Sequence, residues 1–289
     1  MSGAGKGKAM NKFIESINAG KIIMAAHRGD KKRRPENTEP AFRHAIEVGA
    51  DCIETDLHQT KDGEIVVIHD AGLKRTTDGT GYVYEKTLAQ IKELDAGSWF
   101  SPEYAGTRVP TFEEFLDIVG PYPDMMLNLE LKDYPRDVGD MTYDTADKVI
   151  AAVERRGMSD RVMINSFSWQ VLKYVHEKYG DKYPLHGFHP AFLMQSPEED
   201  LFPYLTYVCL FNCVKRPDGS VDWSPDKTPE QRRQDFLEVK NVLHCEPCVC
   251  FGTDTPELMK TAVDNGVTMF TCNDPESAAE ILRGLGLRK

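Results

Sequence analysis

The alternation of short apolar runs with amphipathic segments constrains the fold of this chain more than any other feature. Strand-length apolar runs followed by segments of helical periodicity favour parallel βα units. The candidate strands are residues 22–26, 51–57, 65–69, 126–131, 162–166, 184–188, 206–211, 248–251 and 267–271. The candidate helices are residues 39–48, 111–119, 142–156, 168–179, 229–240, 256–264 and 275–284.

The chain length of 289 residues suits one large α/β barrel, which typically needs about 250 residues. An eight-stranded barrel has no place for a ninth strand, so one candidate is surplus or lies outside the barrel. Two stretches break the alternation. Residues 71–110 are interpreted as an excursion from the barrel, and residues 212–228 as a long surface loop.

Charge and cysteine content exclude several classes of protein. A net charge of -11 argues against a nucleic-acid partner, which normally requires a basic face. Seven cysteines are an odd number and indicate no disulfide framework. The apolar stretch IIMAA is too short for a signal sequence or a membrane span. We therefore expect a cytoplasmic protein with no stable membrane association.

Carboxylates recur in pairs at the ends of two candidate strands. Glu54 and Asp56 project from the same face of their strand because strand side chains alternate, and Glu130 and Lys132 repeat this spacing. Buried carboxylates are costly unless they bind a cation. Three of them from two strand ends supply an oxygen-rich site for a hard divalent cation, and Lys132 favours an anionic ligand.

Two histidines stand at the ends of two other candidate strands. His27 and Arg28 end the first, and His69 and Asp70 end the third. In an α/β barrel, charged residues at the carboxyl ends of strands are usually catalytic. Two imidazoles, a cation and two basic side chains suit phosphate ester chemistry. One imidazole can remove a proton from the attacking oxygen while the other protonates the leaving oxygen.

The connection between the second and third candidate strands is too short for a helix. Residues 58–64 either run back extended along the strand or turn as a hairpin at Lys61-Asp62-Gly63. Both geometries bring His69 close to Glu54 and Asp56.

Each of these residues also has a structural interpretation. A single strand-end carboxylate or histidine more often belongs to a solvated rim than to a site. Asn37 and Thr38 are explained as helix caps. His58 shares the strand face of Asp56, and the sequence allows either a place in the site or a packing role for it.

The cysteine-rich segment 244–250 superficially resembles a zinc cluster. It lacks a second pair of ligands, and Cys248 and Cys250 fit a strand pattern, so we interpret it as a strand. His186 and His189 have no carboxylate nearby in the sequence and are interpreted as structural.

A series of motifs resembles the glycerophosphodiester phosphodiesterase family. The motifs are HRG, PENTEPAF, GADCIETDLHQTKDGEIVVIHDAGLKRTTDGTG, LDAGSWF, RVPTFEEFL and LNLELK. They run from about Ala26 to Lys132, with weaker agreement at NSFSWQVL. The resemblance implies a TIM (β/α)8 barrel with a small insertion after the third strand, about residues 71–110. On this basis we expect a flexible segment at residues 1–20 and one domain over residues 21–289.

The resemblance also implies an activity and a site. The activity is hydrolysis of glycerophosphodiesters, such as glycerophosphocholine or glycerophosphoethanolamine, to glycerol 3-phosphate and an alcohol. The implied residues are Glu54, Asp56 and Glu130 as ligands of Mg²⁺ or Ca²⁺, His27 and His69 as the acid–base pair, and Arg28 and Lys132 as phosphate contacts. The family favours His69 as the base. The partner is a small-molecule substrate, and a homo-oligomer is left open.

The carboxyl-terminal third departs from the family pattern. Phe251 to Asp254 replace the usual Trp-Thr-Val-Asn, so Phe251 is a candidate pocket wall without an indole donor. Thr271-Cys272 replaces the usual Thr-Asp. Two alternatives are retained: a lysophospholipase D or sphingomyelinase D-like phosphodiesterase, and a non-catalytic barrel that binds phosphoesters.

Overall fold

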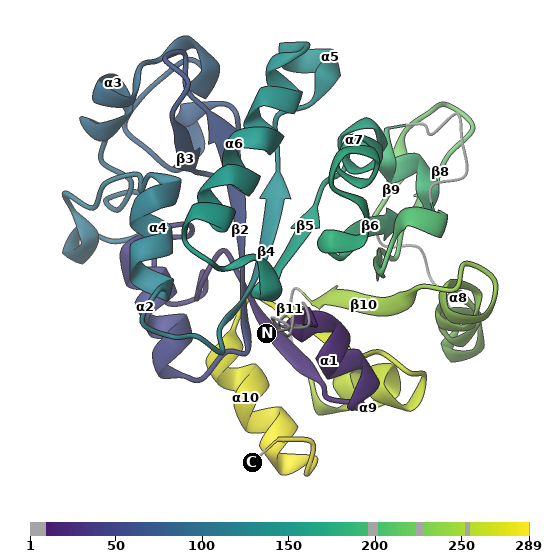
Figure 1. Ribbon diagram of the computed structural model, residues 1–289. Coiled ribbons are helices and arrows are strands. Elements are labelled where there is room, and N and C mark those ends of the chain that lie inside the picture. The colour runs from purple at the N-terminus through teal and green to yellow at the C-terminus, as the bar shows by residue number, and fades with distance from the viewer. Residues whose placement is uncertain (1–9, 196–201, 224–227, 252–254, 289) are drawn as a thin grey trace, which may run out of the picture.

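Eight parallel strands close into a barrel surrounded by helices (Figure 1). The computed structural model describes residues 10–195, 202–223, 228–251 and 255–288. Strand β1 pairs with both β2 and β11, which closes the sheet and confirms the TIM barrel. The barrel strands in order are β1 (Ile23–His27), β2 (Cys52–Gln59), β4 (Met126–Leu131), β5 (Val162–Asn165), β6 (Leu185–His189), β7 (Tyr207–Leu210), β10 (Glu246–Phe251) and β11 (Met269–Cys272).

The seven predicted helices are all present, with ends that shift by one residue at most. Their apolar faces pack on the barrel in one continuous core. The Thr111 hydroxyl accepts a hydrogen bond from the Glu114 amide, so the predicted capping box opens α4. These helices are α2 (Glu39–Glu47), α4 (Phe112–Val119), α6 (Met141–Arg155), α7 (Trp169–Tyr179), α8 (Pro229–Asn241), α9 (Pro256–Asp264) and α10 (Pro275–Gly284).

The surplus strand is β3 (Ile65–Val67), which lies outside the barrel. It pairs antiparallel with β2, and the backbone amide of Ile68 continues the ladder to the carbonyl of Asp56 at 3.1 Å. Gly63 has a φ of +88°, a conformation that favours glycine in the tight turn. Of the two connections left open by the sequence, the hairpin is therefore the one present, and it returns the chain to the backbone of Asp56.

The predicted excursion, residues 71–110, folds from short elements at the upper left of Figure 1. They are η1 (Leu73–Arg75), η2 (Val83–Glu85), α3 (Leu88–Lys92) and η3 (Pro102–Tyr104). A separate apolar cluster holds them, formed by Val66, Ile68, Leu73, Val83, Ile91, Ala96 and Val109. The excursion follows the third strand in chain order, as predicted, although this strand is not a barrel strand.

Helix α1 (Lys12–Asn18) occupies part of the segment that we predicted to be flexible. The Asn11 side chain accepts from the Phe13 amide as the helix cap, and its amide group donates to the carbonyl of Val162 at 2.9 Å. Phe13 is fully buried with its ring edge-on to Tyr207. Both partners begin barrel strands, so α1 covers the amino-terminal end of the barrel. The rest of that prediction, residues 1–9, lies outside the described residues.

Phe13→Ala is expected to destabilise the fold by about 3–5 kcal/mol, because it empties a fully buried aromatic site. Urea unfolding followed by circular dichroism measures the change. Glu15→Ala on the exposed face of the same helix is the control and should stay within about 0.5 kcal/mol. Equal effects of the two variants would show that α1 contributes nothing through packing.

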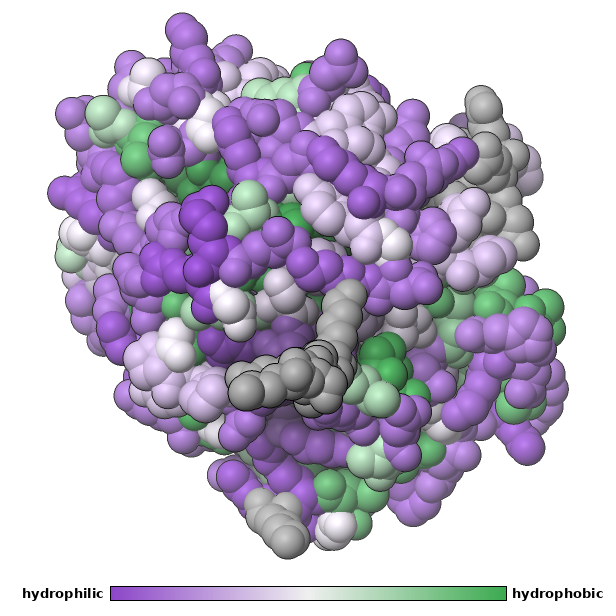
Figure 2. Space-filling view, viewed as in Figure 1, coloured by the Kyte–Doolittle hydropathy of each residue, from purple (hydrophilic) through white to green (hydrophobic). Residues whose placement is uncertain are grey.

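The predicted surface loop at residues 212–228 contains a small hairpin, β8 (Val214–Lys215) and β9 (Val221–Asp222). The remaining short elements are α5 (Pro135–Val138), η4 (Ser159–Arg161), η5 (Gly180–Lys182), η6 (Ala191–Met194) and η7 (Phe202–Tyr204). Figure 2 shows a mostly hydrophilic face with scattered hydrophobic residues. Across the described ranges, no helix combines the length and apolar character needed to cross a membrane.

Candidate active site

The predicted polar residues meet at the carboxyl end of the barrel. The strand register places His27 beside Glu54 and Asp56 beside Glu130. One cavity of about 230 Å³ is lined by His27, Arg28, Glu54, His69, Asn128, Glu130, Asn165, Phe167, His186, Phe188, Cys209, Phe211, Cys250 and Thr271. The structure thus gathers residues from β1, β2, β4 and the end of the β2–β3 hairpin, as the strand-end argument predicted.

Glu54, Asp56 and Glu130 form a buried carboxylate cluster. Their oxygens lie within 4.8 Å of one another, and the residues are only 2%, 0% and 6% exposed. Glu54 Oε1 and Asp56 Oδ1 have no hydrogen-bond partner among the described residues. Burial, then the charges of Asp56 and Glu130, raise the pKa of Glu54 well above its usual value. Unpaired buried oxygens in mutual repulsion fit a hard divalent cation.

Asp56 is held ionised by its surroundings. Asn37 Nδ2 donates to Asp56 Oδ2 at 2.8 Å, and Arg28 Nε lies 3.2 Å from the same oxygen. Burial alone would raise the pKa of Asp56, but the charges of Lys132, Arg28 and His69, together with the Asn37 bond, hold it below its usual range. Asp56 therefore contributes a fixed negative charge to the carboxylate cluster.

The backbone at Arg28 bends sharply to reach these carboxylates. Arg28 has a φ of +57°, a costly conformation for a residue with a side chain. In this position its amide donates both to the carbonyl of Glu54 and to Glu54 Oε2, each at 3.0 Å. Gly29 follows with a φ of +76°, and a Cβ there would come within 2.6 Å of the carbonyl carbon of Ala41. The HRG motif therefore needs its glycine for this bend.

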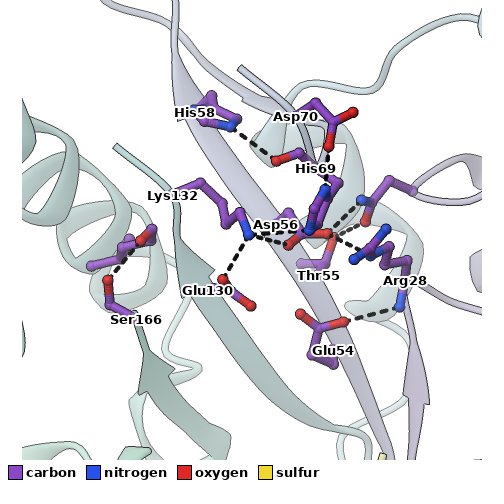
Figure 3. Close-up of polar contacts among 12 residues, drawn as sticks. Arg28, Glu54, Thr55, Asp56, His58, His69, Asp70, Glu130, Lys132 and Ser166 are labelled. Atoms are coloured by element: carbon purple, nitrogen blue, oxygen red, sulfur yellow. Dashed lines mark hydrogen bonds and ion pairs between the residues drawn. The ribbon is translucent and has the colours of Figure 1, made fainter. Parts of the chain in front are cut away.

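Lys132 links the carboxylate cluster to His69 (Figure 3). Its Nζ donates to Glu130 Oε1 at 2.8 Å and lies 3.1 Å from His69 Nε2. An ammonium group only donates, so His69 Nε2 carries the lone pair. The proton is then on Nδ1, which donates to Asp70 Oδ1 at 2.5 Å. His69 thus turns its Nε2 lone pair toward Lys132, while Asp70 accepts from its other ring nitrogen.

His27 is held as a neutral imidazole. Its Nδ1 donates to Asn273 Oδ1 at 2.6 Å, which leaves Nε2 facing Glu54 Oε2 at 3.9 Å. Burial, then the charges of Arg28 and Lys31, lower the pKa of His27 to about 3. An anionic group bound beside Nε2 would counter this effect and favour the protonated ring.

Several positioning residues were missed or misread in the sequence. Asn37, predicted as a helix cap, has a φ of +55° and bonds the side chains of Thr55 and Asp56 instead. The sequence feature that could have indicated this role is the residue type, because asparagine tolerates a left-handed backbone better than most residues do. His58 contacts Asp133 Oδ1 at 2.7 Å and the carbonyl of His69 at 3.2 Å. It fixes the backbone of His69 and does not line the cavity.

Glu36 joins two arginines at the edge of the site. Its Oε1 accepts from Arg28 and from Arg75, each at 2.8 Å. Burial alone would raise the pKa of Glu36, but the Arg75 hydrogen bond and the charge of Arg28 lower it to about 2. Glu36 therefore aligns the Arg28 guanidinium, and Arg75 in turn contacts Asp70.

Glu36 is expected to contribute stability that depends on pH. Its pKa falls from 4.5 to about 2 on folding, so this stability is present above pH 4.5 and is lost as the pH falls through about 2. The difference corresponds to roughly 3 kcal/mol. Glu36→Gln should flatten the acid side of a urea-stability profile, whereas Glu257→Gln on the exposed surface of α9 should not. Parallel profiles for the three proteins would contradict this role.

Aromatic residues form the wall opposite the carboxylates. The rings of Phe167 and Phe188 stack with centroids 3.6 Å apart, and Phe211 lies 5.8 Å from Phe188. All three line the cavity. Phe251, the predicted wall residue, ends β10, but its side chain and residues 252–254 lie outside the described residues. The described wall comes from β6 and from the segments that follow β5 and β7.

Comparisons with known proteins agree with one another. The sequence model of the glycerophosphoryl diester phosphodiesterase family matches residues 27–277. A glycerophosphodiester phosphodiesterase of Caldanaerobacter subterraneus is 35% identical over 260 residues, which cover 85% of this chain and 99% of the relative. The crystal structure of an Agrobacterium tumefaciens glycerophosphodiester phosphodiesterase superposes with a TM-score of 0.69 at 26% identity, covering 90% of this chain and 99% of that one.

A further solved structure, an Oleispira antarctica phosphodiesterase, contains the product sn-glycerol-3-phosphate. It superposes with a TM-score of 0.74 and covers 92% of this chain and 99% of that one. Its sequence identity is 22%, so this likeness concerns the fold.

Proposed function

This chain belongs to the glycerophosphoryl diester phosphodiesterase family and hydrolyses glycerophosphodiesters, and we propose that it releases glycerol 3-phosphate from small substrates such as glycerophosphocholine or glycerophosphoethanolamine. The observation that carries this proposal is a cluster of three buried carboxylates, two of which line one cavity together with both histidines. A cation site, an acid–base pair and basic side chains beside one small cavity suit phosphodiester hydrolysis.

We assign Glu54, Asp56 and Glu130 as the ligands of Mg²⁺ or Ca²⁺, because both cations prefer oxygen donors. When bound, the cation stabilises negative charge on the phosphoryl oxygens. Arg28 and Lys132 add positive charge for the same phosphoryl oxygens. Their contacts with Asp56 and Glu130 keep both side chains directed at the carboxylate cluster.

His69 is assigned as the general base. Its Nε2 lone pair removes the proton of the attacking oxygen, and Asp70 stabilises the imidazolium that forms. His27 is assigned as the general acid, which protonates the leaving alcohol. The phosphodiester anion raises the pKa of His27 when it binds, because a negative charge beside Nε2 favours the protonated ring.

A lysophospholipid substrate is a second candidate, supported by the rim of the cavity. Trp223 is 56% exposed and packs edge-on against Phe211, and Val214 on the same hairpin is 41% exposed. An exposed aromatic beside the cavity wall suits an acyl chain. The non-catalytic barrel has less support, because the described site retains both histidines and all three carboxylates. A cytoplasmic location and a homo-oligomer remain proposals.

The test is release of glycerol 3-phosphate from glycerophosphocholine with added Mg²⁺, with Ca²⁺ and with EDTA. Metal-dependent release supports the proposal. A parallel assay measures choline release from lysophosphatidylcholine, and preference for that substrate would favour the second candidate. No release from either substrate by folded protein would contradict both.

A further inference from the structure

A second cluster of potential metal ligands lies in the barrel core. His186 on β6, Cys209 on β7 and Cys248 on β10 are buried, and their ligand atoms lie within 4.8 Å of one another. Cys209 and Cys248 are direct partners in the strand register. The three residues therefore converge from neighbouring strands, although they are far apart in the sequence.

The cluster lies beneath the carboxylate site and in contact with the same cavity. Asn128 is two residues before Glu130 on β4, and two strand residues span about 7 Å. The Asn128 amide reaches His186 Nδ1 at 3.2 Å, so the cluster is one side-chain layer deeper in the barrel. His186 and Cys209 line the cavity, which gives an ion a route from solvent.

We propose that His186, Cys209 and Cys248 bind a thiophilic divalent cation such as Zn²⁺. Thiolate and imidazole select Zn²⁺ over Mg²⁺ and Ca²⁺, which prefer oxygen. Binding releases the two thiol protons to solvent. Two thiolates and a neutral imidazole then cancel the charge of the cation, so the complete centre is neutral and suits a buried position.

The distance between His186 and Cys248 is close to that in a zinc centre. His186 Nε2 and Cys248 Sγ are 3.3 Å apart. Tetrahedral bonds of about 2.3 Å to sulfur and about 2.0 Å to nitrogen require a separation of about 3.5 Å. A small side-chain shift is sufficient.

Asn128 provides the outer support that metal-binding histidines usually have. Its Nδ2 faces His186 Nδ1, while its buried Oδ1 has no hydrogen-bond partner among the described residues. A half-turn of the amide exchanges the two atoms. Oδ1 then accepts from Nδ1–H and leaves the Nε2 lone pair directed at Cys248.

This site differs from the cysteine-rich segment 244–250 considered in the sequence. Only Cys248 of that segment belongs to the cluster, and the other two ligands come from β6 and β7. The competing interpretation is a core hydrogen bond between Cys248 and His186 with no role in binding. That interpretation predicts that the protein binds no cation at this cluster.

The test separates the two cation sites in the full-length chain. Glu54→Gln with Glu130→Gln removes the carboxylate site, and the chelator-stripped protein is then dialysed against Zn²⁺ or Mg²⁺. We expect about one Zn²⁺ per chain and no Mg²⁺. Adding Cys209→Ser and Cys248→Ser should reduce bound Zn²⁺ to background. Cys245→Ser is the matched control, because this buried thiol donates only to backbone carbonyls in the contacts described and should leave binding intact.

Thiol labelling provides a second measurement in case the serine variant fails to fold. In the Glu54→Gln, Glu130→Gln protein, Zn²⁺ should protect Cys209 and Cys248 from alkylation during partial unfolding, as read by peptide mass spectrometry. Absence of Zn²⁺ binding, or binding that persists without both thiols, would overturn the proposal. The result is independent of the phosphodiesterase assay, which uses the unaltered carboxylates.

Discussion

Replacing Glu54 with alanine is expected to abolish both divalent-cation binding and phosphodiesterase turnover. Glu54 supplies one of three clustered carboxylates, and its loss leaves Asp56 and Glu130 too few to hold a hard cation. The change also removes the Oε2 atom that accepts from the Arg28 amide. Calorimetric titration with Mg²⁺ and Ca²⁺ measures binding, and glycerol 3-phosphate release measures turnover.

Two further variants make this result specific. Glu54→Gln keeps the shape of the side chain but removes its charge, so it should lose the cation while it remains folded. Glu47→Ala changes an exposed carboxylate at the end of α2 and should behave like the unaltered protein. Full turnover by Glu54→Ala, or by the unaltered protein stripped of divalent ions, would refute the cation assignment.

His69→Ala is expected to slow turnover by about 10²–10⁴-fold while cation affinity stays nearly unchanged. His69 contacts Lys132 and Asp70 but does not belong to the carboxylate cluster, so its loss removes proton transfer and leaves the ligands in place. Steady-state kinetics together with cation titration measure the two effects separately.

Asp70→Asn tests the contact between His69 and Asp70. It should slow turnover by an amount comparable with His69→Ala, because an amide donor facing Nδ1 moves the ring proton to Nε2 and removes the lone pair of the base. His176→Ala on α7 is the control histidine, remote from the described site. A His69→Ala protein that is unfolded, or one with nearly normal turnover, would point to a structural histidine.

The sequence predicted the barrel and the meeting of the charged residues at one end of it, because both rest on local patterns. Strand and helix periodicity located the eight barrel strands, and side-chain alternation placed Glu54 and Asp56 on one face. Helix α1 was missed because its seven residues are too few to show a periodicity, and its stability comes from Phe13 packing on Tyr207.

Contacts between distant segments could not be read from one sequence. Asn273 lies far from His27 along the chain, and no pattern connects the two residues before the barrel closes. For the same reason the sequence did not indicate that His186 contacts Cys248, since each residue taken alone resembles an ordinary core residue. Spacing along the chain detects ligands within one segment and not those that meet across strands.

The β2–β3 hairpin has a consequence for how this chemistry can be inherited. The residues from Glu54 to His69 form one continuous peptide that carries two of the proposed cation ligands and the proposed base, held together by a ladder of main-chain hydrogen bonds. A one-residue insertion in its turn would reverse the face on which the base emerges. The hairpin therefore acts as one rigid unit, whereas the aromatic wall is built from separate segments of the other half of the barrel.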